Sequence, residues 1–374
     1  PDARTVVVNF GVGKPFPYIP FVGAQAPIIQ KAQFQDCLGP KAPECTDANF
    51  NPIGTGPFKV VEFKPNDVIT LEANENYREA GKPAFATVTF KGGGDATAAG
   101  RSVLETGEFD YAWNLQLAPD VINDMEAKGM GTVVADFGTS VERLMVNLTD
   151  VSPELGDERG TAKHPHPFLT DKAVRQALSM AIDRELLTEI GYGPAGTPTC
   201  NVLPAPAIYA STANDGCLVQ DIAGANALLD SAGWVDSDGD GVRDKDGVKL
   251  SILYQTSTNA VRQDYQALIK QWWSEIGVET ELRNINASVF FGSDPGSPDT
   301  FQKFFADIEM YTNNFDGTDP EQYMANWKCD QAPRPETQWQ GNNMPRFCSE
   351  EYDALVAQMA ETSGLEARAE LAKK

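Results

Sequence analysis

The chain has 374 residues, 41% of them hydrophobic and 22% charged, which is enough for two domains with separate cores. Thirty Lys and Arg against 53 Asp and Glu give a net charge of −23, which argues against nucleic acid or an anionic lipid surface as a partner. No apolar run is long enough to cross a bilayer, so we expect a protein that is not embedded in a membrane.

The cysteines fall into local pairs, each closing a short loop rich in Pro, Gly, Asn or Asp, and none has the C-x-x-C spacing of zinc or redox sites. Three small disulfides are the simplest account, and they indicate an oxidising compartment, the periplasm or the cell exterior. Six free buried thiols remain the alternative, because spacing alone does not prove pairing. The pairs are Cys37 with Cys45, Cys200 with Cys217, and Cys329 with Cys348.

The first part of the chain predicts a mixed sheet with few helices. The β-branched run 5–9 reads as a strand, and 58–63 and 68–73 read as a hairpin turning at Pro65-Asn66-Asp67. Further predicted elements are helices at 96–107 and 118–128 and strands at 109–113 and 143–147.

Composition changes at 149–168, where Asp, Glu, Gly, Pro and both histidines occur without periodicity. We interpret this stretch as a linker between domains. The sequence thus divides into 1–148, part of a first lobe with hinge strands, the crossing 149–168, and a second α/β lobe, 169–374.

The second lobe opens with helices capped by Thr170 or Asp171 and by Asp183, and a later helix, 223–233, stops at Gly. Its most informative stretch is strand 249–254, helix 261–276 and strand 278–282, the order of a parallel βαβ unit. Residues 304–311 predict one more strand.

Ligands of open parallel sheets bind beyond the carboxyl ends of the strands, and three such loops are rich in amides and hydroxyls: 255–259, 283–286 and 312–316. That lining suits a polar organic solute. The candidate ligand-binding residues are Thr256, Ser257, Asn286, Tyr311, Asn313, Asn314, Phe315 and Asp316, with Trp113 and Asn114 after the short strand of the first lobe.

Asp316 is the candidate with the most specific chemistry, because a carboxylate in a partly dry cleft pairs strongly with a ligand ammonium. The alternative is that the segment from Asp316 to Pro320 is only turn chemistry or a helix cap. For Trp113 the alternative is a place in the core.

Asp236, Asp238 and Asp240 alternate as in the start of a calcium loop, with Gly241 at the bend. The twelfth position is Gly247, where a calcium loop needs a bidentate Glu. A charged hairpin turn before Lys249 is therefore the better interpretation, and a weak calcium site stays open.

No nucleophile elbow, phosphate loop, zinc-protease motif or dinucleotide fingerprint occurs in the sequence. The only histidines, His164 and His166, lie in the linker, which leaves a histidine-based triad without a base. We therefore predict a protein that is not an enzyme and needs no cofactor. A glycosidase-like pair of carboxylates is the enzymatic alternative, although no pair stands out.

Four segments resemble the signature segments of family 5 solute-binding proteins, in the same order and over nearly the whole chain. They are 51–58, 175–184, 227–234 with its Asp-Gly turn, and 316–320. The resemblance implies a type II periplasmic-binding-protein fold of two α/β lobes joined by hinge strands. It also implies a chain trimmed at both ends, without the inserted amino-terminal domain.

In peptide-binding members an aspartate of the last segment holds the ligand's amine, and Asp316 is the residue that aligns. The Gly-Trp that peptide binders carry shortly before this segment is replaced here by Met310-Tyr311. Related proteins bind oligosaccharides, opines, nickel complexes or haem.

The resemblance implies the substrate-binding component of an ABC uptake transporter, periplasmic or tethered outside the cytoplasmic membrane. We expect a monomer that closes like a Venus flytrap on a short peptide or similar solute and delivers it to an inner-membrane permease. The alternatives from other classes are a secreted hydrolase and a calcium-stabilised interaction module built on the Asp236 loop.

Overall fold

The computed structural model describes residues 2, 5–18, 21, 27–315, 317 and 319–374. The chain divides into two compact units. Unit 1 comprises Pro1–Ile19, Gln116–Asp124 and Val133–Lys374, and unit 2 comprises Pro20–Leu115 and Met125–Thr132.

Unit 2 contains a three-stranded antiparallel sheet in the order β1-β2-β3, formed by Phe58–Lys64, Val68–Ala73 and Thr87–Lys91. The predicted hairpin of β1 and β2 is confirmed, and Asn66 takes the left-handed conformation in its turn (φ 60°). The sequence did not predict β3. The helices of unit 2 are α2 (Lys31–Phe34), η1 (Gly39–Glu44), α3 (Thr46–Phe50) and α4 (Ala96–Leu104).

The predicted helix at 96–107 is confirmed as α4, which ends at Leu104. Its first turn is capped by the Asp95 carboxylate, which accepts from the Ala98 amide at 2.7 Å. The helix predicted at 118–128 is α5 (Pro119–Glu126). The strand predicted at 109–113 is wrong, because no neighbouring strand in the described part of the chain pairs with that stretch.

Unit 1 is built on a four-stranded sheet in the order β4-β9-β7-β8. These strands are Ser140–Val146, Ile308–Asn314, Ser251–Ser257 and Glu279–Ile285. Strand β7 runs parallel to both neighbours, while β4 is antiparallel to β9. The predicted unit of strand, helix and parallel strand is confirmed as β7, α9 (Ala260–Ser274) and β8.

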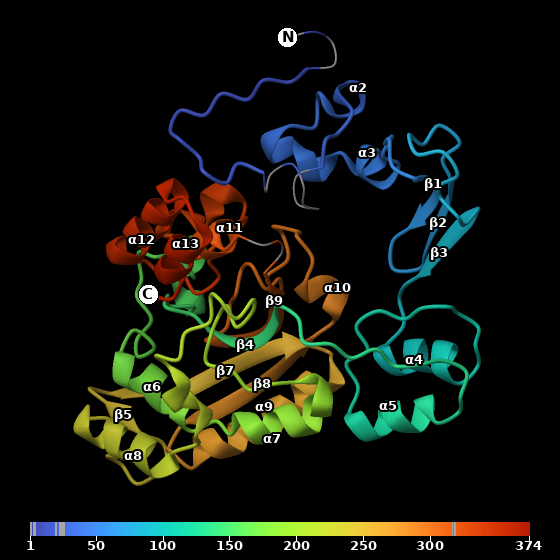
Figure 1. Cartoon of the computed structure of the whole chain (residues 1–374). Helices are drawn as coiled ribbons and strands as arrows, with labels where there is room; N and C mark the ends of the chain where they lie inside the picture. Colours follow the sequence, from blue (N-terminus) through green and yellow to red (C-terminus); the bar gives the residue numbers. More distant parts are fainter. Residues whose placement is uncertain (1, 3–4, 19–20, 22–26, 316, 318) are drawn as a thin grey trace. The chain divides into compact units, whose positions relative to one another are not determined.

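One face of this sheet carries the largest core, because alternate side chains of each strand point the same way. Ile252, Tyr254, Ile308 and Met310 pack there against Trp273 and other apolar side chains of the helices. Figure 1 shows α9 alongside β7 and β8. The helices of this layer are α6 (Lys172–Met180), α7 (Arg184–Gly191), α8 (Ile222–Ser231) and α9, with the predicted caps Asp171 and Asp183 confirmed.

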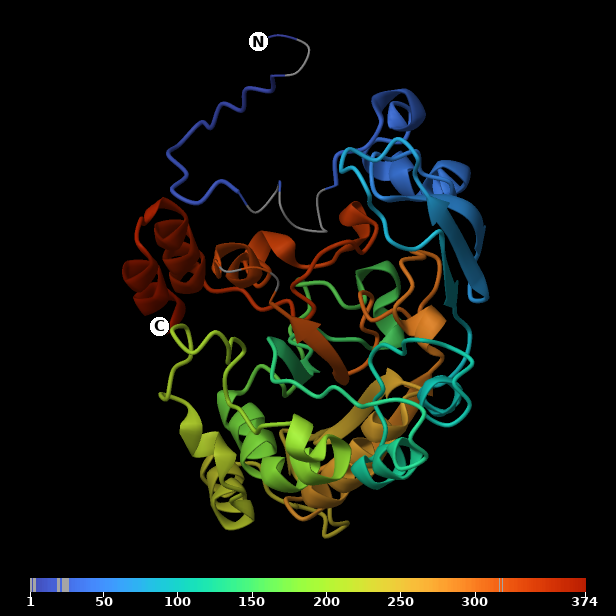
Figure 2. The same ribbon diagram turned by 45° about the vertical axis from the view of Figure 1, so that its right-hand side comes forward.

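The opposite face carries an aromatic cluster around Phe290, Phe304 and Tyr311. A third cluster holds α11 (Glu321–Ala325) and the neighbouring helices α12 (Glu350–Glu361) and α13 (Leu365–Ala372), the dark red pair in Figures 1 and 2. The remaining elements of unit 1 are η2 (Pro153–Glu158), η3 (Gly193–Ala195), η4 (Asp215–Leu218), β5 (Asp244–Lys245), β6 (Val248–Lys249), α10 (Ala287–Phe290), η5 (Cys329–Gln331) and η6 (Pro335–Thr337).

The amino-terminal run differs from the prediction. Residues 5–9 form no strand, and Val6 and Val7 are 87% and 60% exposed. Strand propensity alone does not order such a run, because a strand needs a partner for its backbone hydrogen bonds. The three predicted disulfides are confirmed.

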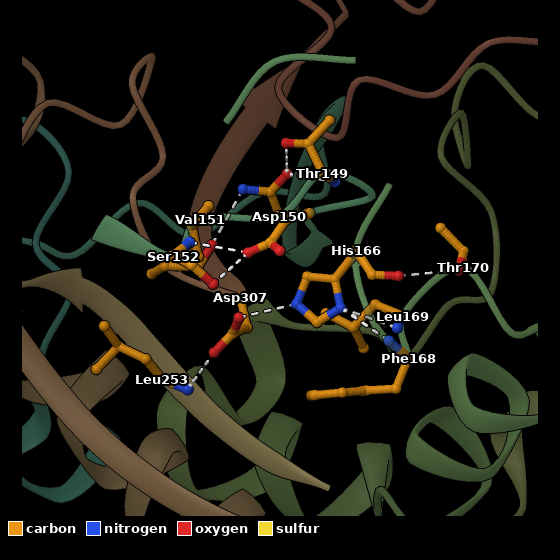
Figure 3. A network of polar contacts seen from close by, with 12 residues as sticks. Thr149, Asp150, Val151, Ser152, His166, Phe168, Leu169, Thr170, Leu253 and Asp307 are labelled. Carbon is orange, nitrogen blue, oxygen red and sulfur yellow. Dashed lines mark hydrogen bonds and ion pairs between the residues drawn. The ribbon is translucent and has the colours of Figure 1, made fainter. Parts of the chain in front are cut away.

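The stretch 149–168, predicted to be a linker, lies inside unit 1 and is attached to the sheet through His166, which is 3% exposed (Figure 3). Its Nδ1 accepts from the amides of Phe168 and Leu169 at 3.3 and 3.0 Å, and its Nε2 lies 2.8 Å from Asp307 Oδ1. The other Asp307 oxygen accepts from the Leu253 amide of β7 at 2.6 Å. These partners place the imidazole proton on Nε2 and give the ring a structural role.

We expect His166→Ala to lower the free energy of unfolding by about 2–3 kcal/mol, because two buried amides and a carboxylate lose their partner. His164→Ala is the matched control: its ring bonds only Glu158 at the surface, and its loss costs under about 0.5 kcal/mol. Urea unfolding of both variants checks this. Equal losses would contradict the structural role of His166.

Candidate functional site

The carboxyl ends of three strands meet at one edge of the unit 1 sheet. Ser257 of β7 lies opposite Ile285 of β8, and Thr256 lies opposite Met310 of β9. Because β4 is antiparallel to β9, its beginning reaches the same edge, where Glu142 is paired with Thr312.

A buried ion pair joins Glu142 to Arg262 of α9 at this edge. The Arg262 Nε donates to Glu142 Oε1 at 2.9 Å, and the two side chains are only 5% and 11% exposed. A second guanidinium nitrogen donates to the Ser257 hydroxyl at 3.0 Å. Helix α9 positions the arginine, since Asn259 caps the helix by accepting from the Arg262 amide.

Three neutral groups, together with the Arg262 Nη2 at 3.3 Å, donate to the second carboxylate oxygen of Glu142. It accepts from the hydroxyls of Thr312 at 2.7 Å and Tyr192 at 3.0 Å, and from the Gln116 amide at 3.3 Å. Gln116 also accepts from Asn259 at 2.6 Å. Burial and the nearby Glu142 charge raise the pKa of Tyr192, so its hydroxyl remains a donor.

An aromatic ring lies beside this network. Phe291, which follows α10, is 46% exposed, and the Arg262 guanidinium lies 5.8 Å from its ring centre. The buried rings of Phe290 and Tyr311 hold it at centroid distances of 4.9 and 6.5 Å. The edge therefore offers fixed polar groups next to one exposed aromatic surface, a combination typical of sites for small organic ligands.

The other face of the same sheet buries a carboxylic acid, Glu309, with 0% exposure. Desolvation raises its pKa well above the ordinary value, and the opposing effects of the Gln255 amide at 3.0 Å and of Arg346 are smaller. Its second oxygen has no hydrogen-bond partner among the described residues. The neutral form of Glu309 is thus the favoured one.

Comparison with known proteins agrees with this architecture. Residues 1–333 match the model of the bacterial extracellular solute-binding proteins, family 5, middle region. The chain belongs to this family.

Among curated relatives of this family 5 chain, the oligopeptide-binding protein AppA of Bacillus subtilis is 30% identical over 63% of the chain and 40% of its own length. The heme-binding protein A of Haemophilus influenzae is 26% identical over 92% of the chain and 56% of its own length. The chain thus spans about half the length of the curated relatives it matches.

The fold of the family is shown by solved structures. The structure of AppA in complex with a nonapeptide matches 92% of the chain and 62% of its own length, with a TM-score of 0.72 at 23% identity. The murein tripeptide binding protein MppA of Escherichia coli matches 96% of the chain and 62% of its own length, with a TM-score of 0.70 at 20% identity. In the described residues, no helix is long and apolar enough to cross a membrane.

Several predicted ligand-binding residues of the family 5 chain lie inside strands, because β7, β8 and β9 run about three residues further than expected. Thr256 is buried and donates to the Met310 carbonyl at 2.7 Å, and Tyr311 and Phe315 lie in aromatic clusters. Asn286 caps α10. Asn313 is half-buried and Asn314 is exposed at the strand end. Their roles toward a ligand stay predictions.

Asp316 lies outside the described residues. Its neighbour Asp319 is 2% exposed and accepts 2.5 Å bonds from Arg368 of α13, so the second aspartate of this segment serves structure. Trp113, 77% exposed, and Asn114 belong to unit 2, and their place in a ligand site also stays a prediction.

The three aspartates of the candidate calcium loop are exposed, with one oxygen of each within 4.8 Å of the others. Asp238 and Asp240 both pair with the Lys249 ammonium. The Asp236 oxygens accept from the amides of Gly239 and Gly241. The loop thus forms a charged turn before the β5–β6 hairpin, and no calcium role follows from it.

Sequence reasoning missed Glu142, Arg262, Tyr192 and Phe291. The one available signal was a charged residue in each of two apolar patterns. Glu142 lies near the start of β4, and Arg262 lies on the buried side of α9 between Val261 and Tyr265. Their meeting depends on strand pairing that no local pattern encodes.

We expect Arg262→Met to cost about 3–5 kcal/mol of stability, because it leaves Glu142 buried without its counter-ion. Adding Glu142→Gln should restore part of the loss, since the amide still bonds the Thr312 hydroxyl. Arg175→Met is the matched control, because Arg175 bonds only the Leu169 carbonyl. Urea unfolding of these three variants and of the single Glu142→Gln variant measures this, and additive losses in the double variant would contradict the pairing.

We expect Glu309→Gln to change the pH dependence of stability. A carboxyl whose pKa is raised in the folded state stabilises fully below its unfolded pKa near 4.5 and loses this contribution as pH rises, by up to about 1.4 kcal/mol per pH unit. The stability of the glutamine variant relative to the natural protein should therefore rise from pH 4 to pH 8. Glu281→Gln, on the exposed side of β8, is the control. If the free energies of unfolding of the Glu309 variant and the natural protein changed with pH in the same way, the claim that Glu309 is buried in its neutral form would be refuted.

Proposed function

We propose that this family 5 chain is the substrate-binding component of an ABC uptake transporter for short peptides or similar polar solutes. The solute binds at the carboxyl-end edge of the unit 1 sheet and is delivered to a membrane permease. The observation that carries the proposal is the fixed polar edge itself, where a neutralised ion pair, amides and hydroxyls lie beside the exposed ring of Phe291.

The chemistry of this edge supports holding a ligand. Glu142 has its charge balanced by Arg262 and its second oxygen bonded by three neutral donors besides Arg262, so proton transfer is not its role. Amides and hydroxyls donate and accept without net charge, which suits the peptide group. A ligand that touches both lobes would favour the closed form by its extra contacts.

The relatives support a peptide as the solute. AppA is named as an oligopeptide-binding protein and its structure holds a nonapeptide. The heme-binding relative makes a non-peptide solute the second candidate. The three disulfides support a place outside the cytoplasm, and the resemblance supports a monomer that works with an inner-membrane permease.

We propose that Asp316 holds the free amine of the peptide. In the intact protein, peptides with a free amine should raise the melting temperature, and Asp316→Asn should weaken their binding about 10- to 100-fold, because a charge-assisted hydrogen bond is lost. Their acetylated analogues, which lack the charge, should lose less than about threefold. Isothermal titration calorimetry measures both.

Asp264→Asn, which removes the same charge from the exposed side of α9, is the control and should leave both affinities unchanged. Equal losses for free and acetylated peptides would remove the role of Asp316. If only haem or sugars raised the melting temperature, one of them would replace the peptide as the proposed solute. Turnover of the peptide would favour a hydrolase.

A further inference from the structure

Two buried acceptor atoms of β7 and β9 lack a donor. Gln255 and Glu309 lie directly opposite each other in this parallel strand pair, and they are 1% and 0% exposed. The Gln255 Nε2 donates to one carboxyl oxygen of Glu309 at 3.0 Å. The other carboxyl oxygen and the Gln255 carbonyl oxygen have no hydrogen-bond partner among the described residues. A buried acceptor without a donor is costly, so both atoms call for an explanation.

One proton on Glu309 explains both atoms. An ionised carboxylate only accepts hydrogen bonds, whereas a protonated one also offers an O–H donor. A carboxylic acid and a side-chain amide are then complementary, because each has one oxygen that accepts and one group that donates. The bond from the Gln255 Nε2 already joins the two groups at one end. At the other end, the Glu309 O–H is the donor that the Gln255 carbonyl oxygen lacks.

Arg346 is the cation that could take the place of this proton. Burial lowers its pKa to about 10, so it is charged at neutral pH. It acts on Glu309 through its charge alone, without a hydrogen bond, and its Nη atoms donate instead to three backbone carbonyls. Its Nε has no partner among the described residues. An ionised Glu309 that turns toward Arg346 is therefore the alternative that the experiment must exclude.

Two titratable groups flank Glu309 on its own strand. Asp307 and Tyr311 lie two residues before and after it, on the same face of the sheet. The Asp307 carboxylate accepts from the Leu253 amide and lies 2.8 Å from the His166 ring nitrogen, so it is engaged elsewhere. Burial raises the pKa of the Tyr311 hydroxyl, which stays neutral. Neither group bonds the Glu309 carboxyl.

The neighbouring strand β4 supplies no donor either. Its apolar Met145 is paired with Glu309, and Arg143 lies two residues before Met145 on the same face. The Arg143 guanidinium lies 5.0 Å from the ring centre of Trp327, and none of its nitrogens makes a hydrogen bond of normal geometry with a described residue. Within the described part of the chain, the Glu309 carboxyl is thus bonded by Gln255 alone.

We propose that Glu309 carries a proton on its second oxygen and donates it to the Gln255 carbonyl oxygen, so that acid and amide form a proton-dependent lock between β7 and β9. Two hydrogen bonds then join side chains of neighbouring strands in the core. Desolvation raises the pKa of Glu309, so the lock is closed below this pKa and opens as pH rises through it. The open form holds a buried carboxylate with one bond, and the Gln255 carbonyl oxygen loses its donor.

The lock lies close to the edge at which the solute is proposed to bind. Ser257 follows Gln255 by two residues and Thr312 follows Glu309 by three, and both hydroxyls belong to the ion-pair network of that edge. Opening of the lock therefore loosens both strands next to this network. The inference concerns the strands and holds whichever solute binds.

Infrared difference spectroscopy on the intact protein tests for the proton at pH 6, where exposed carboxyls are ionised. The natural protein should show a carbonyl band of a protonated carboxyl that Glu309→Gln lacks, and Glu281→Gln, on the exposed side of β8, should keep this band. In Gln255→Leu the band should move to higher frequency, because the O–H has lost its acceptor. No loss of a band in Glu309→Gln would show that Glu309 is ionised and overturn the lock. A band that stays in place in folded Gln255→Leu would overturn it as well.

Hydrogen exchange tests whether the proton works as a switch. Protection factors of the Ser257 and Thr312 amides, corrected for the intrinsic pH dependence of exchange, should fall at least about tenfold from pH 5 to pH 9 in the natural protein. They should stay constant in Glu309→Gln, since this amide pairs with Gln255 but does not titrate. Constant protection in the natural protein, or the same fall in both proteins, would overturn the switch. Circular dichroism shows whether Gln255→Leu is folded, and if it is not, the exchange measurement decides.

Discussion

The parallel pairing of β7 with both β8 and β9 is the constraint on which the site depends. It brings three strand ends to one edge, and the antiparallel β4 adds its first residues there. Glu142 and Thr312 are 170 residues apart in sequence, yet their side chains bond at 2.7 Å. An ion pair as buried as that of Glu142 and Arg262 is stable only when further donors and acceptors complete it. The convergence of strand ends supplies them.

The two faces of the same strand pair solve the burial of charge in different ways. Toward the helices, Glu142 has a counter-ion and three further donors. Toward the aromatic cluster, Glu309 and Arg143 keep atoms without partners among the described residues. The raised pKa of Glu309 favours its protonated, neutral form, which avoids this cost, whereas an arginine stays charged. The satisfied network holds the strand ends in one arrangement at the edge.

Much of the fold could be predicted from the sequence because its signals are local. The hairpin of β1 and β2, the caps Asp171 and Asp183, and the order of β7, α9 and β8 follow from turn chemistry and periodicity. The strand predicted at 5–9 is wrong because β-branched residues favour an extended backbone but do not supply the neighbouring strand with which it must pair. Only part of the site could be predicted. Its location follows from the rule that ligands bind beyond the carboxyl ends of parallel strands. The pairing of Glu142 with Arg262, however, requires knowledge of the register between distant strands.

The net charge of the chain bears on the approach of the proposed peptide solute. A chain of net charge −23 creates a negative potential at long range, which favours the approach of an amine and opposes that of a carboxylate. At the edge itself Arg262 balances the charge of Glu142, so this ion pair adds no net charge there. The long-range potential then attracts the amine of a zwitterion while it repels the carboxylate. A solute carrying both charges is matched by this arrangement, whereas a simple anion would meet the repulsion without the compensating attraction.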